Sequence, residues 1–257
     1  ESISTELFDQ PEVLVDEISK RTIRALSTNG NYSLGGIGIG APNGNFFNGT
    51  IEFAPNLKWK GIIPLAKMFE DKMGVETLLT NDANAAALGE MIFGGAKGMN
   101  DFLFITLGTG LGSGIVANGQ LIYGHDSFAG ELGHVIMFVD GRKCGCGRHG
   151  CLETYCSATG IVTTYVELTK QPANKDINAR FIYNKALEGE LEAIEVFNFT
   201  GNILGLALAN AVAFSSPQAI FLFGGLAAAG DLIFNPTRAS FEKNLLHIYK
   251  NKIKILP

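Results

Sequence analysis

The chain has 257 residues, of which 46% are hydrophobic and 18% are charged, and its formal net charge is −5 at pH 7. This length allows one large domain or two small ones, and the composition excludes an intrinsically disordered chain. The charge provides no broad basic surface, so we expect no nucleic-acid partner, although a nucleotide is compatible with it. Glycine is frequent, with 32 residues against an average near 7%, which indicates tight turns or backbone that approaches a ligand.

Helical and strand-like segments alternate along the first part of the chain. A helix is predicted over residues 11–26, because apolar residues recur at helical spacing, the first residue is a proline, and Gly30 follows the end. A strand over 34–40 and a helix over 63–73, which Gly74 should end, come next.

The same alternation continues to the end of the chain. The predicted segments are a strand over 75–80, an alanine-rich helix over 81–93, a buried strand over 101–107, a helix over 203–214, and strands over 219–223 and 252–256. Helices interleaved with short apolar strands predict an α/β fold with a largely parallel sheet. No apolar run reaches the roughly 18 residues of a membrane helix, so we expect no membrane partner.

All four cysteines fall within one short segment, and they are Cys144, Cys146, Cys151 and Cys156. A disulfide framework would spread its cysteines, so we expect reduced thiols and a cytoplasmic protein. The Cys-x-Cys-x4-Cys spacing of the first three suits a structural Zn²⁺, which takes four ligands. Spacing alone leaves the fourth ligand open among His134, His149 and Cys156.

A glycine-rich segment, LGTGLGSG at residues 107–114, directly follows the buried strand 101–107. Alternating glycines let a turn present successive N–H groups to phosphate oxygens, and Thr109 adds a hydroxyl. The segment is not a Walker A loop, because no Gly-Lys-Ser/Thr follows it, and it is not a Rossmann fingerprint, because residues 115–116 resemble another strand. The alternative is a tight glycine hairpin with no ligand.

Polar residues also stand where the strand over 75–80 meets the alanine-rich helix, in NDANAAALGE at residues 81–90. Asp82 could be a helix N-cap, which stabilises a helix by about 1 kcal/mol. The carboxyl end of a parallel strand is also where α/β proteins bind ligands, and a carboxylate there can act as a general base. Two further glutamates flank the cysteine cluster, Glu131 in AGELGH and Glu153 in CGCGRHGCLE.

These motifs resemble the ROK family, and within it the bacterial glucokinase-type sugar kinases. The motifs are GIGIGAPNG at 36–44, APNLKW at 54–59, NDANAAALGE at 81–90, LGTGLGSG at 107–114, AGELGH at 129–134, CGCGRHGCLE at 144–153 and IFLFGG at 220–225. The resemblance implies an actin-like, ribonuclease-H-like α/β fold of two lobes, residues 1–98 and 99–257. It implies ATP-dependent phosphorylation of a hexose, with glucose to glucose 6-phosphate as the first candidate.

The resemblance also implies roles for individual residues. It makes Asp82 the general base. The implied hexose ligands are Asn81, Asp82, Glu131, His134 and Glu153. The implied zinc ligands are His134, Cys144, Cys146 and Cys151. The implied ATP-binding residues are Gly108, Thr109, Gly110 and Gly112 at the phosphates and Gly224 and Gly225 at the adenosine. Mg²⁺ would accompany ATP, and members are usually homodimers and sometimes homotetramers.

The sequence departs from the family pattern in two ways. The amino-terminal Asp-x-Gly-x-Thr phosphate loop and the closing C-terminal helix are not in it, so we expect further residues upstream, and a chain that truly began at Glu1 should be inactive. Asn43 stands where many members have glycine, and we expect Gly44 to compensate.

Two other functions fit the same motifs. A ROK transcriptional repressor shares the zinc motif, adds a DNA-binding winged helix and tends to lose the ATP loop, whereas LGTGLGSG is intact here. A non-catalytic, zinc-stabilised sugar-binding module would bind sugar without releasing ADP. The kinase is the function that the sequence favours.

Overall fold

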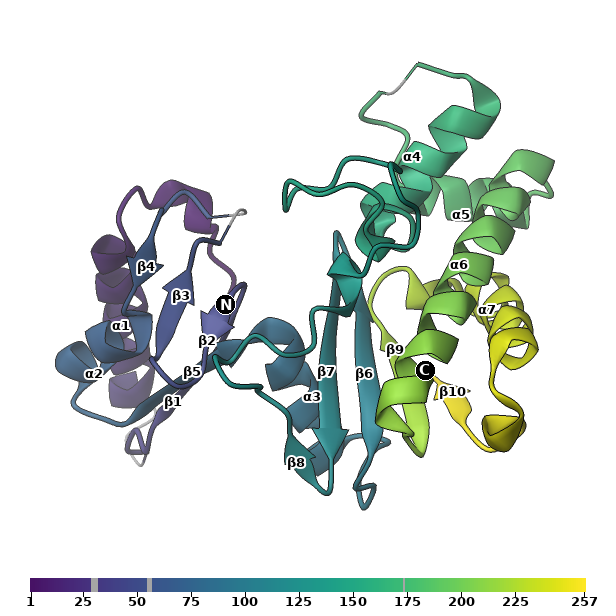
Figure 1. The fold of residues 1–257 in the computed structure, drawn as a ribbon. Coiled ribbons are helices and arrows are strands. Elements are labelled where there is room, and N and C mark those ends of the chain that lie inside the picture. The colour runs from purple at the N-terminus through teal and green to yellow at the C-terminus, as the bar shows by residue number, and fades with distance from the viewer. Residues whose placement is uncertain (29–31, 55–56, 173) are drawn as a thin grey trace. The chain divides into compact units, whose positions relative to one another are not determined.

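The computed structural model of the protein describes residues 1–28, 32–54, 57–172 and 174–257 (Figure 1). The chain divides into two compact units. Unit 1 comprises Glu1–Leu88 and Tyr123–Ala129, and unit 2 comprises Gly89–Ile122 and Gly130–Pro257. The chain passes from the first to the second within helix α3 (Asp82–Phe93). The predicted division into lobes of residues 1–98 and 99–257 stays a prediction.

In the described residues, unit 1 contains two small sheets, two complete α-helices, one short 3-10 helix and the first part of α3. Its elements are η1 (Thr5–Leu7), α1 (Pro11–Thr28), β1 (Ile37–Ala41), β2 (Gly44–Asn45), β3 (Thr50–Glu52), β4 (Ile62–Ile63), α2 (Leu65–Met73) and β5 (Thr77–Asn81). Strands β1 and β5 pair in parallel, and β2, β3 and β4 form an antiparallel sheet. The core is built from apolar side chains of α1, α2 and the strands, among them Val15, Ile51, Phe69 and Leu79. This core supports the end of β5, where Asn81 lies.

Most of the predicted elements of unit 1 form, with shifted boundaries. The first helix is confirmed and continues to Thr28, while Gly30 lies outside the described residues. The second helix begins at Leu65 rather than at residue 63, because Ile62 and Ile63 pair with β3 and Pro64 precedes the first turn. It ends as predicted at Gly74, which adopts φ 68° and donates its N–H to the Glu70 carbonyl.

Unit 2 is built on a five-stranded sheet in the order β10-β9-β6-β7-β8. Its strands are β6 (Phe102–Leu107), β7 (Leu111–Ala117), β8 (Gln120–Leu121), β9 (Ala219–Phe223) and β10 (Lys254–Leu256). The expectation of a largely parallel sheet is met only in part among the described residues, because the pairs β6–β9 and β9–β10 are parallel, whereas β7 pairs antiparallel with both β6 and β8. The reason is the glycine-rich turn, which reverses the chain from β6 directly into β7.

Helices lie against this sheet (Figure 1), and side chains of both the strands and the helices form the main hydrophobic core. The helical elements are η2 (Leu132–His134), η3 (Leu152–Thr154), α4 (Ala158–Thr169), α5 (Ala179–Leu187), α6 (Leu191–Ser215), η4 (Ala227–Ala229), α7 (Asp231–Asn244) and η5 (His247–Tyr249). Helix α6 is 25 residues long and, by length and composition alone, apolar enough to cross a membrane. Its side chains Leu204 and Leu208 are buried in the core with Ile105 and Phe241, so it is the central helix of unit 2.

Candidate functional site

The glycine-rich segment forms the turn of the β6–β7 hairpin. Its carbonyls are engaged by the start of α4, since the Ala158 N–H donates to the Gly108 carbonyl at 2.8 Å and the Thr159 hydroxyl donates to the Thr109 carbonyl at 2.8 Å. The N–H groups of Thr109 and Gly110 have no hydrogen-bond partner among the described residues. The hairpin and the anion-binding interpretation are therefore compatible, because the turn leaves two adjacent donors unpaired.

Gly112, also predicted to bind phosphate, lies inside β7 rather than in the turn. Its N–H donates to the Thr106 hydroxyl at 3.1 Å. The turn that we call the glycine loop therefore consists of residues 108–110.

The predicted adenosine-side glycines, Gly224 and Gly225, follow strand β9. Gly224 adopts φ 106°, and a Cβ there would lie 2.6 Å from the Leu107 carbonyl oxygen, so only glycine fits. The Leu226 N–H donates to the same carbonyl at 3.1 Å. The adjacent ends of β6 and β9 thus bring this turn and the glycine loop together.

Glu153 connects the glycine loop to the cysteine cluster. Its Oε2 accepts a hydrogen bond from the Leu111 N–H at 3.0 Å, and its Oε1 lies 3.9 Å from Cys144 Sγ. A Cβ at Gly110 would collide with the same carboxylate. Glycine at position 110 therefore lets the Glu153 carboxylate pack against the loop and also leaves the backbone exposed.

His134 and three cysteines form a cluster whose ligand atoms all lie within 4.8 Å of one another. The Sγ atoms of Cys146 and Cys151 are 3.7 Å apart, and His134 Nδ1 lies 3.6 Å from Cys144 Sγ. Sulfurs that share a tetrahedral Zn²⁺ at 2.3 Å would be about 3.8 Å apart, so the donor set and its spacing fit that ion.

The other two candidates for the fourth ligand lie outside this cluster. Cys156 is completely buried, and its thiol donates to the Thr200 carbonyl at 3.5 Å. His149 is exposed and forms an isolated β-bridge with Lys143. Both lie in the segment of residues 142–151, which carries Cys144, Cys146 and Cys151 and which we call the cysteine knuckle.

The three thiols of the cluster differ in pKa, because burial raises the pKa of Cys144 and Cys151, whereas the pKa of Cys146 is lowered. Burial and the neighbouring thiols raise the pKa of Cys144 to about 12. Burial also raises the pKa of Cys146, but hydrogen bonds from the backbone and side chain of Arg148 outweigh it and lower the pKa to about 6. Cys146 is therefore a thiolate at neutral pH, which is the form that binds metal.

The two ring nitrogens of His134 face different neighbours. Nδ1 faces Cys144, whereas Nε2 lies 3.8 Å from Glu131 Oε2. Glu131 and His134 belong to one short segment that packs against β7. A side chain at Gly133, within this segment, would collide with the Leu111 carbonyl. One imidazole can thus serve a metal and a polar ligand at the same time.

Asn81 and Asp82 lie in unit 1, where β5 ends and α3 begins. The Ala83 N–H donates to Asn81 Oδ1 and to Asp82 Oδ1, each at 2.8 Å. Asn81 therefore shares the capping of the helix with Asp82. The Asp82 side chain is exposed, and within the described chain its only hydrogen bond comes from Ala83.

The expectation that Gly44 compensates for Asn43 is wrong. Asn43 itself adopts the left-handed conformation, with φ 50°, and its side-chain amide donates to the Glu52 carbonyl at 2.9 Å. Asparagine tolerates this conformation better than most residues do. Gly44 has another role, because a Cβ there would collide with the backbone of Thr80.

Two arrangements around these sites could not be predicted from the sequence. Arg142 joins the cysteine knuckle to α4, because its guanidinium donates to the Thr154 carbonyl at 2.8 Å and pairs with Glu167. Segment Tyr123–Ala129 returns to unit 1, where Tyr123 stacks on Phe46 with ring centroids 4.3 Å apart. Both depend on contacts between distant residues, so no local pattern could have revealed them.

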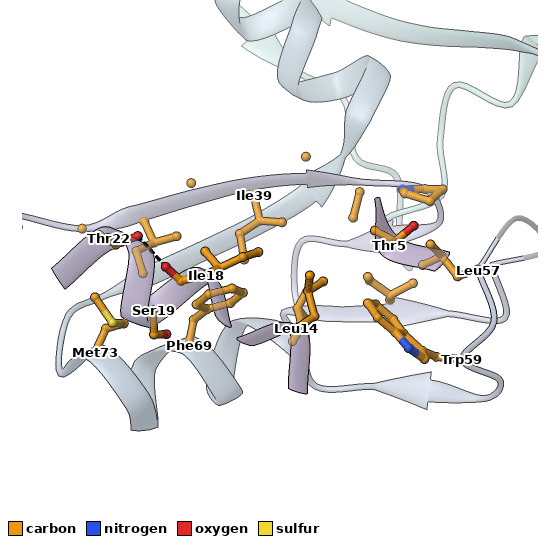
Figure 2. Close-up of a pocket in the computed structure, with 18 of the residues that line it drawn as sticks. Thr5, Leu14, Ile18, Ser19, Thr22, Ile39, Leu57, Trp59, Phe69 and Met73 are labelled. Carbon is orange, nitrogen blue, oxygen red and sulfur yellow. Dashed lines mark hydrogen bonds between the residues drawn. The ribbon is translucent and has the colours of Figure 1, made fainter. Parts of the chain in front are cut away.

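A cavity of about 580 Å³ lies elsewhere in unit 1, beside β1 (Figure 2). Apolar side chains such as Leu14, Ile39, Trp59 and Phe69 point into it. None of the predicted site residues, all of which lie in the described ranges, lines this cavity. A hexose needs several hydrogen-bonding groups, so the cavity is not the candidate sugar site.

Solved structures identify the class of this fold, which is the actin-like, ribonuclease-H-like α/β fold of two-lobed sugar kinases. A ROK family glucokinase from Streptomyces griseus, in complex with glucose and AMPPNP, matches with a TM-score of 0.78 and 31% identity. The match covers 94% of this chain and 82% of that one. The chain belongs to the ROK family, whose model matches residues 2–257.

Proteins similar in sequence include both glucokinases and xylose repressors. The chain is 36% identical over 219 residues to a glucokinase of Halalkalibacterium halodurans, covering 80% of this chain and 66% of that protein. It is 35% identical over 254 residues to a glucokinase of Streptomyces coelicolor, covering 92% and 78%. It is 33% identical over 226 residues to a xylose repressor of Bacillus spizizenii, covering 88% and 57%.

A ROK family transcriptional regulator homologous to the E. coli MLC protein also shares the fold, with a TM-score of 0.82 and 25% identity over 95% of this chain and 63% of that one. Fold alone therefore does not separate kinases from regulators within the family.

Proposed function

We propose that the protein transfers the γ-phosphoryl group of ATP to a hexose, with glucose to glucose 6-phosphate as the first candidate reaction. The observation that carries this proposal is the glycine loop, in which the N–H groups of Thr109 and Gly110 have no partner in the described part of the chain. Adjacent unpaired N–H groups form a concave site for phosphate oxygens. A regulator that binds only sugar has no need of such a site.

ATP binds, in this proposal, along the ends of β6 and β9. Gly108, Thr109 and Gly110 hold the phosphates, and Gly224 and Gly225 leave room for the adenosine. Mg²⁺ neutralises the charge that develops on the phosphates, so positioning and charge compensation account for most of the catalysis. The similarity to a glucokinase solved with AMPPNP supports this assignment.

Asp82 is the proposed general base, which accepts the proton of the attacking sugar hydroxyl, normally the 6-OH. Its carboxylate is exposed at the carboxyl end of a parallel strand, and Asn81 beside it is a proposed ligand of the sugar. General-base catalysis by a positioned carboxylate contributes about 10²- to 10⁴-fold to such a reaction.

The remaining hexose ligands are Glu131, His134 and Glu153. Zn²⁺ held by His134, Cys144, Cys146 and Cys151 would supply structural rigidity rather than chemistry. His134 would then be fixed through Nδ1, with Nε2 directed to Glu131 and to a sugar hydroxyl. Glutamates held at fixed positions suit a ligand with many hydroxyl groups.

A sugar-responsive transcriptional regulator is the second candidate. The similarity to xylose repressors and to a regulator structure with a TM-score of 0.82 supports it. A cytoplasmic location and a homodimeric or homotetrameric assembly remain predictions for either function.

An assay of the full-length protein separates these candidates. ADP release is measured with MgATP and, in turn, glucose, mannose, allose, fructose, N-acetylglucosamine and N-acetylmannosamine. We expect ADP release that depends on one of these hexoses, and its loss in Asp82→Asn, which controls for a contaminating kinase. Sugar binding by calorimetry without ADP release from any hexose would instead support the regulator or a sugar-binding module.

A further inference from the structure

The glycine loop is held on one side by the first two residues of α4. The Ala158 N–H donates to the Gly108 carbonyl, and the Thr159 hydroxyl donates to the Thr109 carbonyl, both at 2.8 Å. Only the second of these bonds comes from a side chain. It joins residues that are 50 positions apart in the sequence.

These two carbonyls belong to the same peptide units as the two unpaired N–H groups. A trans peptide is planar, so its C=O and N–H point in opposite directions. Fixing the Gly108 carbonyl toward α4 therefore directs the Thr109 N–H away from α4. Fixing the Thr109 carbonyl in the same way directs the Gly110 N–H away from α4, to the side on which a phosphate can bind.

We propose that Thr159 is a positioning residue for the nucleotide, whose hydroxyl orients the Thr109–Gly110 peptide so that the Gly110 N–H can donate to a phosphate oxygen. This inference rests on the proposed function of the loop as the phosphate site. Glycine at position 110 removes the steric restraint that a side chain would place on this peptide, so its orientation depends on the bond from Thr159.

Thr159 is not needed to begin the helix, which separates its positioning role from a structural one. The N-cap of α4 is Ser157, whose side chain accepts the Gly160 N–H at 3.0 Å. Thr159 itself is exposed, so its methyl group contributes little to the core. Replacement of its hydroxyl should therefore leave the stability of unit 2 almost unchanged.

Thr163 provides a matched control one turn further along α4. Its hydroxyl donates to the Thr159 carbonyl at 3.1 Å, which is a bond within the helix and not to the loop. Thr163→Val therefore makes the same chemical change on the same helix without touching the glycine loop.

The test compares Thr159→Val, Thr159→Ser and Thr163→Val in the full-length protein. Dissociation constants for AMPPNP are measured by calorimetry, KM values are measured for ATP and for the hexose, and melting temperatures are recorded. Loss of one hydrogen bond should weaken AMPPNP binding about fivefold in Thr159→Val. The KM for ATP should rise by a similar factor, with the hexose KM and the melting temperature unchanged, and Thr159→Ser should restore the wild-type values.

Several results would overturn the inference. They are unchanged AMPPNP affinity in Thr159→Val, an equal loss in Thr163→Val, or a loss that Thr159→Ser does not restore. A wild-type protein that binds AMPPNP but phosphorylates no hexose would refute the proposed reaction, while the comparison of variants would still decide the role of Thr159. A wild-type protein that binds no AMPPNP would refute both.

Discussion

Helices α6 and α7 approach each other closely at a glycine, and we predict that an alanine there destabilises the protein although alanine favours helices. A Cβ at Gly205 would lie 2.5 Å from the Thr237 carbonyl oxygen, 2.7 Å from the Phe241 nitrogen and 2.7 Å from Ser240 Cβ. Two of these atoms belong to the backbone of α7, so no rotamer change relieves the overlap. Gly205→Ala must push the two helices apart.

The expected magnitude follows from two opposing terms. Replacing glycine by alanine within a helix contributes about 0.8–1.0 kcal/mol of stability. Overpacking a tight core costs about 1–3 kcal/mol, and we expect the upper half of that range because backbone atoms are involved. The free energy of unfolding should therefore fall by about 1–2 kcal/mol, which corresponds to a decrease in Tm of roughly 3–6 °C for a unit of this size.

Gly89→Ala is the matched control, because Gly89 lies within α3 and has no neighbouring atom within 4 Å of the position of a Cβ. Here only the helix propensity acts, so the stability should rise by up to about 1 kcal/mol. Thermal unfolding followed by circular dichroism, with urea denaturation for the free energies, measures both variants. A rise in stability for both variants, or a fall for both, would refute the reasoning.

The remaining predictions concern the proposed site. Asp82→Asn should lower kcat by about 10²- to 10⁴-fold while calorimetry shows little change in hexose affinity, and near-normal turnover would exclude Asp82 as the base. Elemental analysis should find about one zinc per chain, Cys151→Ser should lose most of it, and a well-folded wild type without metal would contradict the cluster's role. Gly110→Ala should displace the Glu153 carboxylate from the Leu111 N–H, and the free energy of unfolding, measured by urea denaturation, should fall by about 1–2 kcal/mol. Gly108→Ala is the control, because the space around its Cβ is open. This variant should change the free energy of unfolding by no more than about 0.5 kcal/mol. Equal losses in these two variants would show that Glu153 does not restrict the loop.

Much of the secondary structure could be predicted from the sequence because its signals are local. Gly74 ends α2 where predicted, and β9 occupies the predicted residues 219–223. The limits of α6 could not be predicted in this way, since only residues 203–214 were expected and the helix begins at Leu191. Its first turns are helical in the folded protein because Ala193, Val196 and Phe197 are buried in the core of unit 2.

The chemistry of the site could be predicted in part for a similar reason. The Cys-x-Cys-x4-Cys spacing indicates a metal ligand set by itself, but not its fourth member. The structure groups His134 with the three cysteines and leaves Cys156 apart, bonded to Thr200. That choice depends on the path of the chain between residues 134 and 151, which no spacing rule specifies.

Local sequence patterns specify which residue types are available and where many short elements begin and end. They place glycines after a buried strand, a carboxylate at the start of a helix, and thiols on a knuckle, because each of these patterns extends over only a few residues. How these groups contact one another depends on the folding of the whole chain. The Leu111 N–H donates to Glu153 and the Thr159 hydroxyl donates to the Thr109 carbonyl across 42 and 50 residues of sequence. These bonds form because the packed core brings η3 and α4 against the β6–β7 turn.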